Sequence, residues 1–173
     1  MKRKFVLTII GPDQPGIVQK LSNILSDHHA NWLESRMANL AGEFAGILHA
    51  EVDEAEYAAT LTKLNRLQDE GLHVVVKDGH NTKKTGITYR LDVVGNDREG
   101  IVRDISQALA SLRVNVEELV TEFSEAPMSS SPLFKATALI SVGDKASIEV
   151  IQNDLEAIAH DLMIEITRES ENE

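Results

Sequence analysis

The sequence contains no cysteine in its 173 residues, so disulfide bonds and thiol chemistry are excluded. Long hydrophobic runs are also absent, and no segment is long enough to cross a membrane. The start, Met1-Lys2-Arg3-Lys4, is basic, but the apolar stretch after it is too short for the core of a signal peptide. We therefore expect no membrane association and a cytoplasmic location.

Positive charge is scarce. Lys and Arg number 17 against 28 Asp and Glu, which gives a net charge of −11. Proteins that grip nucleic acid do so mainly by neutralising phosphates with clustered basic residues. The largest basic groups here are residues 2–4 and Lys83-Lys84, at one terminus and in a polar segment. We therefore predict no direct contact with nucleic acid.

Catalytic signatures are missing as well. The six histidines do not cluster, and neither H-E-x-x-H nor G-x-S-x-G occurs. His49-Ala50-Glu51 matches the opening of a zinc deaminase signature, but the two cysteines that this signature needs are absent. We predict no catalytic residues, no metal site and no cofactor, and we expect that the chain is not an enzyme.

The sequence repeats itself. The stretch from Gly11 to Val18 returns at residues 95–102, at an offset of 84 (95 − 11 = 84). Residues 44–52 pair with 134–142 at an offset of 90 (134 − 44 = 90), so the second copy carries a six-residue insertion near residues 125–132. The repeat predicts two small domains of roughly 80 to 85 residues each.

Each copy has the same order of predicted elements. In the first copy, strands are expected at residues 5–10, 30–40, 44–52 and 72–77, with helices after the first and third strands. The order βαββαβ folds most simply as a ferredoxin-like sandwich, a four-stranded antiparallel sheet with both helices on one face. We predict an α+β protein with domains at 1–78 and 87–169, a linker at 79–86 and a frayed acidic tail at 170–173.

Local signals refine the first copy. Asp13 suits the N-cap of the first helix, and Asp53 has capping-box spacing for the second. Leu61, Leu64 and Leu67 are predicted to face the core from the second helix. Ala41-Gly42 is predicted to form the tight turn of a hairpin.

The glycine-framed loop before the first helix has two interpretations. One is a tight connection between a strand and a helix. The other is a binding site, because free backbone N–H groups at a helix N-terminus attract a carboxylate. Gly11 and Gly16 would then leave room for close approach. The spacing fits neither a phosphate loop nor a dinucleotide site, and the presence of two copies favours binding of another small ligand.

Asn31 and Asn115 open the second strand of each copy, where we expect the chain to return beside the loop. Asparagine is common in turns, but its amide can also donate to a carboxylate and accept from an ammonium group. Together with the loop, it predicts an amino-acid site. Asp13 and Asp97 could meet the ammonium group, although helix capping is the simpler role for both.

These residues resemble ACT domains, the small regulatory modules that bind amino acids, in two tandem copies that cover nearly the whole chain. The Asp-x-x-Gly-Ile-Val entry to the first helix, at residues 13–18 and 97–102, carries the resemblance. More narrowly, residues 31–44 and 115–120 are similar to the glycine cleavage system transcriptional repressor family. Residues 31–44 are also similar to the regulatory domain of formyltetrahydrofolate deformylases.

The resemblance implies an amino-acid-responsive repressor that lacks a DNA-binding domain and holds a LysR-type transcription activator, with glycine as the releasing signal. It places the effector between neighbouring domains, against the loop and the asparagine. By position, the ligand-binding residues are Gly11, Asp13, Gly16, Ile17, Asn31, Gly95, Asp97, Gly100, Ile101 and Asn115. The alternatives are a ligand-free ACT interaction module or the regulatory subunit of an amino-acid or one-carbon metabolic enzyme. A homodimer is left open.

The two copies of the predicted site are not equivalent. Pro15 becomes Glu99 in the second copy, where an acid would repel a carboxylate. Residues 35–37, which read Ser-Arg-Met, have no match in the second half. One of the two sites could therefore be degenerate.

Overall fold

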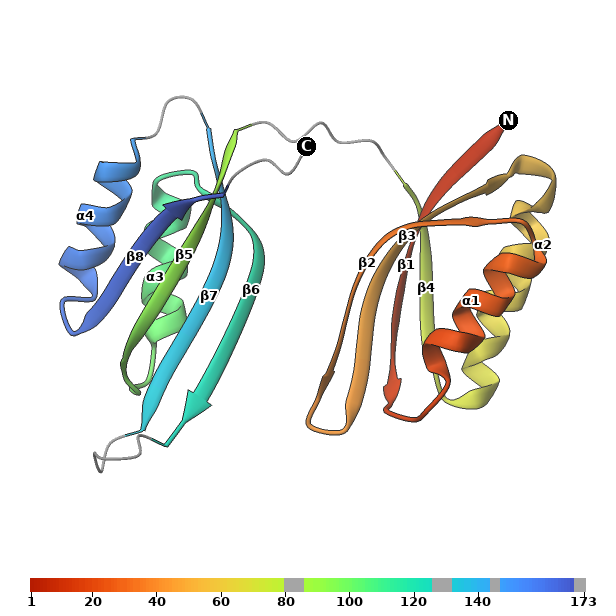
Figure 1. The fold of residues 1–173 in the computed structure, drawn as a ribbon, viewed down its shortest axis with the longest axis horizontal. Coiled ribbons are helices and arrows are strands. Elements are labelled where there is room, and N and C mark those ends of the chain that lie inside the picture. Colours follow the sequence, from red (N-terminus) through yellow and green to blue (C-terminus); the bar gives the residue numbers. More distant parts are fainter. Residues whose placement is uncertain (80–85, 126–131, 144–146, 170–173) are drawn as a thin grey trace. The chain divides into compact units, whose positions relative to one another are not determined.

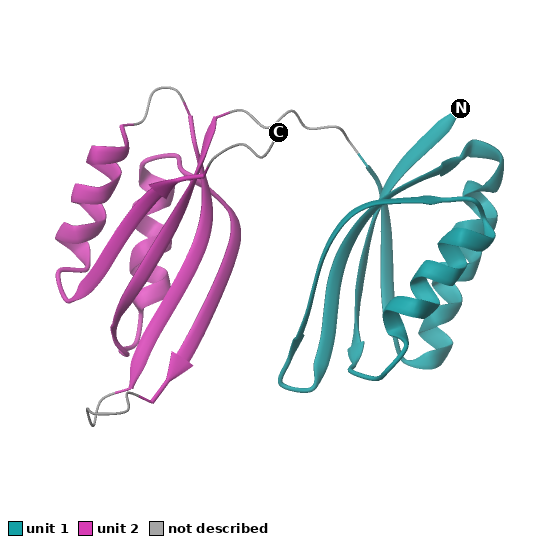
Figure 2. Ribbon diagram, in the orientation of Figure 1, with its two compact units in different colours: residues 1–82 teal, residues 83–173 magenta. Residues whose placement is uncertain are grey.

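The computed structural model describes residues 1–79, 86–125, 132–143 and 147–169. It divides into two compact units, residues 1–82 and 83–173 (Figure 2). The division falls inside the segment predicted as a linker. Most of that linker, nearly all of the insertion loop of the second copy, and the acidic tail lie outside the described residues.

The first unit is a four-stranded antiparallel sheet in the order β2-β3-β1-β4, with its helices on one face (Figure 1). Strands β2 and β4 are its edges. Its elements are β1 (Lys2–Pro12), α1 (Ile17–Asp27), β2 (Asn31–Leu40), β3 (Glu43–Asp53), α2 (Glu54–Asn65), the 3₁₀ helix η1 (Arg66–Glu70) and β4 (His73–Asp78).

The second unit repeats this architecture with the sheet order β6-β7-β5-β8. Its elements are β5 (Ile87–Asn96), α3 (Ile101–Ser111), β6 (Asn115–Ser124), β7 (Leu133–Val142), α4 (Ile148–Ile158) and β8 (Leu162–Arg168). Helices α3 and α4 again cover one face of the sheet (Figure 1). The predicted pair of ferredoxin-like sandwiches is confirmed.

Each unit has its own apolar core between its sheet and its helices. Alternate residues of β1 face the helices, which buries Phe5, Leu7 and Ile9. On the other side, α1 contributes Ile17 and Leu21 to the core at helical spacing. The alternating pattern of the strand and the helical pattern of α1 therefore bury their apolar residues in one layer. This agreement is why the sequence predicts the fold.

One local prediction for the second helix needs correction. The stripe begins with buried Thr60 rather than with Leu61, which is only partly buried. The Thr60 hydroxyl donates to the Glu56 carbonyl at 2.8 Å, so this polar group is satisfied inside the core. The α-helix ends at Asn65, and the 3₁₀ helix η1 carries the chain on to Gly71, which lies in the left-handed region. The predicted Ala41-Gly42 turn is confirmed, with positive φ at both residues.

Candidate functional site

The loop between β1 and α1 borders an open hollow of about 390 Å³ in the first unit. The loop is held in place from the β2–β3 hairpin. The Asp13 amide donates to the Gly42 carbonyl at 2.9 Å, and the Asn39 amide group donates to the Asp13 carboxylate. The hollow is lined by Asp13, Gln14, Gly16, Ile17, Val18, Gln19 and Phe44. The structure thus brings three of the predicted residues, Asp13, Gly16 and Ile17, to one place.

The N-terminus of α1 opens onto this hollow. Gly16 is the N-cap with φ 95°, in the left-handed region that favours glycine. The first intrahelical bond joins the Lys20 amide to the Gly16 carbonyl at 2.9 Å, so the amides of residues 17–19 have no carbonyl partner within the helix. These amides and the positive end of the helix dipole make the hollow attractive to a carboxylate.

The prediction that Asp13 caps this helix is wrong, because Gly16 occupies the cap and no side chain bonds to it. The same holds for Asp97, since Gly100 with φ 85° caps α3. The backbone amide of Asp97 instead donates to the Pro132 carbonyl at 2.9 Å. The aspartates therefore anchor their loops to the neighbouring hairpin, and in the first unit this leaves a carboxylate beside the hollow.

Gly11 and Gly95 have a packing role. A Cβ at Gly11 would lie 2.7 Å from the Gly71 carbonyl oxygen and 3.3 Å from the Leu72 Cα. A Cβ at Gly95 would meet the Leu162 side chain. Both glycines let β1 or β5 pass close to the chain that enters the last strand of the unit, and neither needs a ligand to explain it.

Ile17 and Ile101 point their side chains into the cores, where they are only 3% and 2% exposed. Ile17 can therefore offer the hollow only its backbone. The predicted residues therefore differ in the group that each can offer to a ligand in the hollow. Asp13 offers a carboxylate, residues 16–19 offer main chain, and Gly11 offers neither.

Asn31 and Asn115 do not lie beside the loops, which corrects our expectation. Asn31 pairs with Glu51, and Glu51 pairs with Lys4 near the start of β1. Gly11 lies 11 − 4 = 7 residues further along β1, which at about 3.3 Å per residue is roughly 23 Å. Helix α1 has carried the chain back to the opposite end of the sheet, and α3 does the same before Asn115. No single small amino acid can touch the loop and the asparagine of one unit.

The corresponding loop of the second unit is closed by ion pairs. The Arg98 guanidinium donates to Asp161 at 2.9 Å and to Asp104 at 3.0 Å. Hydrogen bonds from Arg98 hold the pKa of Asp161 and the pKa of Asp104 below their usual range. A carboxylate ligand would have to compete with both aspartates for Arg98 and would also meet Glu99.

Sequence reasoning missed four residues that line the first hollow, namely Gln14, Val18, Gln19 and Phe44. The sequence signal for Phe44 is its recurrence as Phe134 in the second copy. In the structure, Phe44 pairs with Gly11 and Phe134 pairs with Gly95. Across the parts of the chain that the structure describes, no group of three His, Asp or Glu side chains could hold a metal ion. None of the helices in these same parts has the length and apolar character to span a membrane.

Comparison with known proteins agrees with the fold. Residues 3–77 match the family model of the ACT domain. The first unit is an ACT domain, and the second unit is an ACT-like sheet with the same strand order.

Similar solved structures span the full length of the chain. An unknown protein from Galdieria sulphuraria is 26% identical with a TM-score of 0.84, over 98% of this chain and 100% of that one. A candidate glycine cleavage system transcriptional repressor is 18% identical with a TM-score of 0.71, over 98% and 99% of the two chains. At that identity the second likeness shows the fold alone.

One curated relative also matches. The UPF0237 protein MK1213 of Methanopyrus kandleri is 37% identical over 51 residues, which is 30% of this chain. The match spans 57% of the length of that relative.

Proposed function

We propose that this ACT-domain protein is a non-enzymatic regulator whose effector is glycine or another small amino acid, bound in the loop hollow of the first unit. The observation that carries the proposal is the convergence of two complementary groups on one hollow. The amides of residues 17–19 suit a carboxylate, and the Asp13 carboxylate suits an ammonium group. An amino acid is the small molecule that presents both groups.

The residues that line the hollow favour a small effector. Gly16 has no side chain, and Phe44 and Val18 border the same hollow with apolar surface. Since Asp13 is held by the Asn39 amide, its carboxylate is oriented before a ligand arrives. A short ligand fits this arrangement better than a long polar one.

We assign the effector to the first unit and not to the second. Gln14 and Pro15 of the first loop are replaced by Arg98 and Glu99, and Arg98 is engaged by its own aspartates. Asn31 and Asn115 lie too far from the loop of their own unit to share this ligand, and their alanine variants test them separately.

We further propose that the protein acts as a glycine cleavage system repressor by holding a LysR-type activator, which glycine releases. Its net charge of −11 suits contact with protein rather than with nucleic acid. The full-length fold likeness to a candidate repressor of that system supports the same assignment. Release would be a population shift, in which the effector favours the conformation that the activator binds less well.

Calorimetry with glycine and with serine tests the effector site. We expect saturable heat and a rise in melting temperature for the wild-type chain. Gln19→Glu places a carboxylate on the hollow without changing side-chain size, so it should weaken binding about tenfold or more by charge repulsion. Asn23→Asp makes the same charge change on an exposed α1 residue that does not line the hollow, and it should leave binding unchanged.

Absence of heat and of any melting shift with millimolar glycine or serine would contradict the effector proposal and favour a ligand-free interaction module. Asn31→Ala and Asn115→Ala provide a separate check, because both side chains are exposed and the fold should survive. If these variants lose the response to ligand, the asparagines contact the effector. A pull-down of the activator, with and without glycine, tests the partner: an activator retained equally in both would exclude the proposed release.

A further inference from the structure

The second unit has a half-open apolar crevice beneath α3, with a volume of about 40 Å³. It lies on the helix-covered face of the sheet, toward the β6 edge. Side chains from β5, α3, β6 and β7 form its walls, and apart from the Ser106 hydroxyl they are all hydrocarbon. The lining residues on the strands are Leu91, Val93, Val116, Leu119, Phe134, Ala136 and Ala138.

The crevice runs from the surface to the core. At its rim, Val102, Val116 and Leu119 are 44%, 37% and 48% exposed, whereas Leu91 and Leu109 inside it are 1% and 2% exposed. Ser106 is exposed and its hydroxyl donates to the Arg103 carbonyl at 3.0 Å. An apolar group can therefore enter from solvent and reach buried hydrocarbon.

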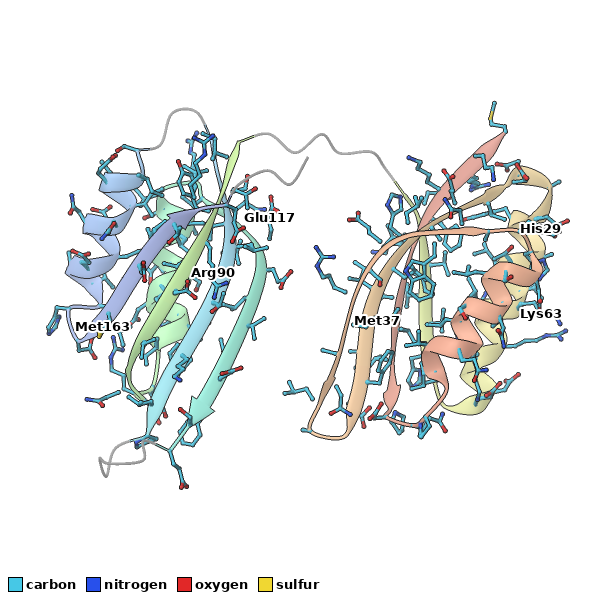
Figure 3. All side chains as sticks on the ribbon, in the orientation of Figure 1. His29, Met37, Lys63, Arg90, Glu117 and Met163 are labelled. Atoms are coloured by element: carbon cyan, nitrogen blue, oxygen red, sulfur yellow. The ribbon has the colours of Figure 1, made fainter. Side chains whose placement is uncertain are left out.

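The first unit fills the equivalent space with its own side chains. Trp32 and Met37 pack from β2 against the core, and Leu48 of β3 is fully buried. Met37, which is labelled in Figure 3, lies across Gly46 so closely that a Cβ there would be 2.7 Å from the Met37 Cγ. Strand register pairs Met37 with Gly46 and places Trp32 on the same face of β2.

In the second unit, the residues at the positions of Trp32, Met37 and Leu48 are all smaller. Val116 stands for Trp32, Thr121 for Met37 and Ala138 for Leu48. The register is the same, since Val116 pairs with Ile140 across the same bulge and Thr121 pairs with Ala136. Leu119 replaces Ser35 and Ala136 replaces Gly46, but these two larger residues line the crevice without filling it.

We infer that this crevice is a binding site for the short aliphatic end of a small amphipathic molecule. Apolar cavities bind small apolar ligands, and the first unit shows that an apolar group occupies the same position in this fold. The polar end of the ligand stays in water at the rim beside Ser106. The site shares no residue with the loop hollow of the first unit, so it stands independently of the proposed effector.

Methyl-labelled NMR of the full chain tests the inference, with xenon and isobutanol as probes. Both probes are small. Xenon is apolar, and isobutanol has an apolar end that can enter the crevice. We expect saturable shifts of the Ala136, Ala138 and Leu109 methyl groups, and no saturable shift at Leu7 or Leu25 in the equivalent region of the first unit. Glycine, which has no side chain, should leave the same methyl groups unmoved.

Matched variants exchange the side chains at these positions between the two units. Ala138→Leu introduces the residue of the first unit, so it should abolish the saturable shifts and keep or raise the melting temperature. If it lowers the melting temperature, Val116→Trp fills the crevice from the rim instead. The pair Trp32→Val and Leu48→Ala should give the first unit the probe response of the second.

Three outcomes would overturn the inference. These are absence of saturable shifts with either probe, shifts that persist when Ala138→Leu and Val116→Trp are each in place, and equal shifts in both units of the wild-type chain. A crevice that accepts only a side chain of a partner protein would leave the small probes without effect, which is the first of these outcomes. None of them depends on whether glycine binds the first unit.

Discussion

The two units bury their sheets beneath helices in the same way, but they fill the space near the edge strand differently. In the first unit Leu48 is fully buried and Trp32 closes the edge, whereas Ala138 and Val116 take these positions in the second. The buried side chains of the strands are apolar in both units, so both units fold. Volume is not retained, and the difference opens a crevice in only one of them.

The loops differ in charge as well as in volume. In the first unit, Lys20 of α1 pairs with Glu70, whereas Asp104 takes the position of Lys20 in the second and pairs with Arg98. This helix position is therefore positive in the first unit and negative in the second. Its ion-pair partner in the second unit, Arg98, lies in the loop itself. This change leaves the first loop open to a ligand and ties the second to the body of its unit.

The open faces of the two sheets also differ. Ile47 and Val75 expose about half of their surface on the first sheet, at 49% and 54%. On the second sheet, the Arg90 guanidinium bonds to Asp92 at 2.7 Å, and the Thr137 hydroxyl donates to the same carboxylate (Figure 3 labels Arg90). The Arg90 hydrogen bonds hold the pKa of Asp92 below its usual range. The two open faces therefore differ at these positions, with exposed aliphatic side chains on the first sheet and an ion pair on the second.

Leu48→Ala should have the largest effect of the variants that test this comparison. It gives the first unit the alanine of the second, but inside a core packed for leucine, so we expect a loss of about 2 to 5 kcal/mol from the free energy of unfolding. Urea denaturation followed by Trp32 fluorescence measures it, since Trp32 is the only tryptophan and reports the first unit.

The reverse exchange, Ala138→Leu, is the control, and it should cause no loss because the crevice has room for the larger side chain. Equal destabilisation by both exchanges would mean that the two units are packed alike and would remove the basis of the comparison.

The next test compares two glycines. Gly11→Ala drives a Cβ against backbone atoms of Gly71, which cannot move away, and should lower the free energy of unfolding by about 1 to 3 kcal/mol. Gly95→Ala meets first the flexible end of the Leu162 side chain, so its loss should be smaller. Thermal unfolding of the two variants, followed by methyl NMR signals of each unit, measures both. A larger loss for Gly95→Ala would show that the close approach is tighter in the second unit.

The sequence was sufficient for the fold because two independent patterns agreed. The alternation in β1 and the helical spacing in α1 both predict one buried layer, and the second copy repeats them. The end of the second helix was less predictable, since a 3₁₀ turn continues the same apolar stripe to Leu67. Local pattern specifies which face is buried but not the hydrogen-bonding of the last turn.

The site was only partly predictable. The glycine loop is a local feature, so its residues could be named from the sequence. Asn31 could not be placed, because its position depends on the direction in which α1 returns and on pairing with β3. The crevice depends on volumes at Trp32 and Leu48 compared with Val116 and Ala138, which become neighbours only through the register of β2 with β3 and β6 with β7.

The smallest expected effect concerns the Arg98 clamp and its dependence on pH. The pKa of Asp161 and the pKa of Asp104 are lowered in the folded chain, chiefly by hydrogen bonds from Arg98. A carboxylate whose folded pKa is lowered stabilises the fold above its ordinary pKa of about 3.9, and this contribution is lost as the pH falls through the lowered value. Arg98→Gln should therefore lower the melting temperature of the second unit slightly at neutral pH and have less effect in acid.

Lys20→Gln is the matched change in the first unit, where the lysine pairs with one carboxylate rather than two. Because these groups are exposed or only partly buried, solvent screens their charges, so both effects should be small and should shrink further in high salt. Melting of each unit, followed by its own methyl signals at neutral and acid pH, separates the two. If Arg98→Gln also gave the second unit a calorimetric response to glycine, the clamp, and not Glu99, would be what distinguishes the closed loop from the open one.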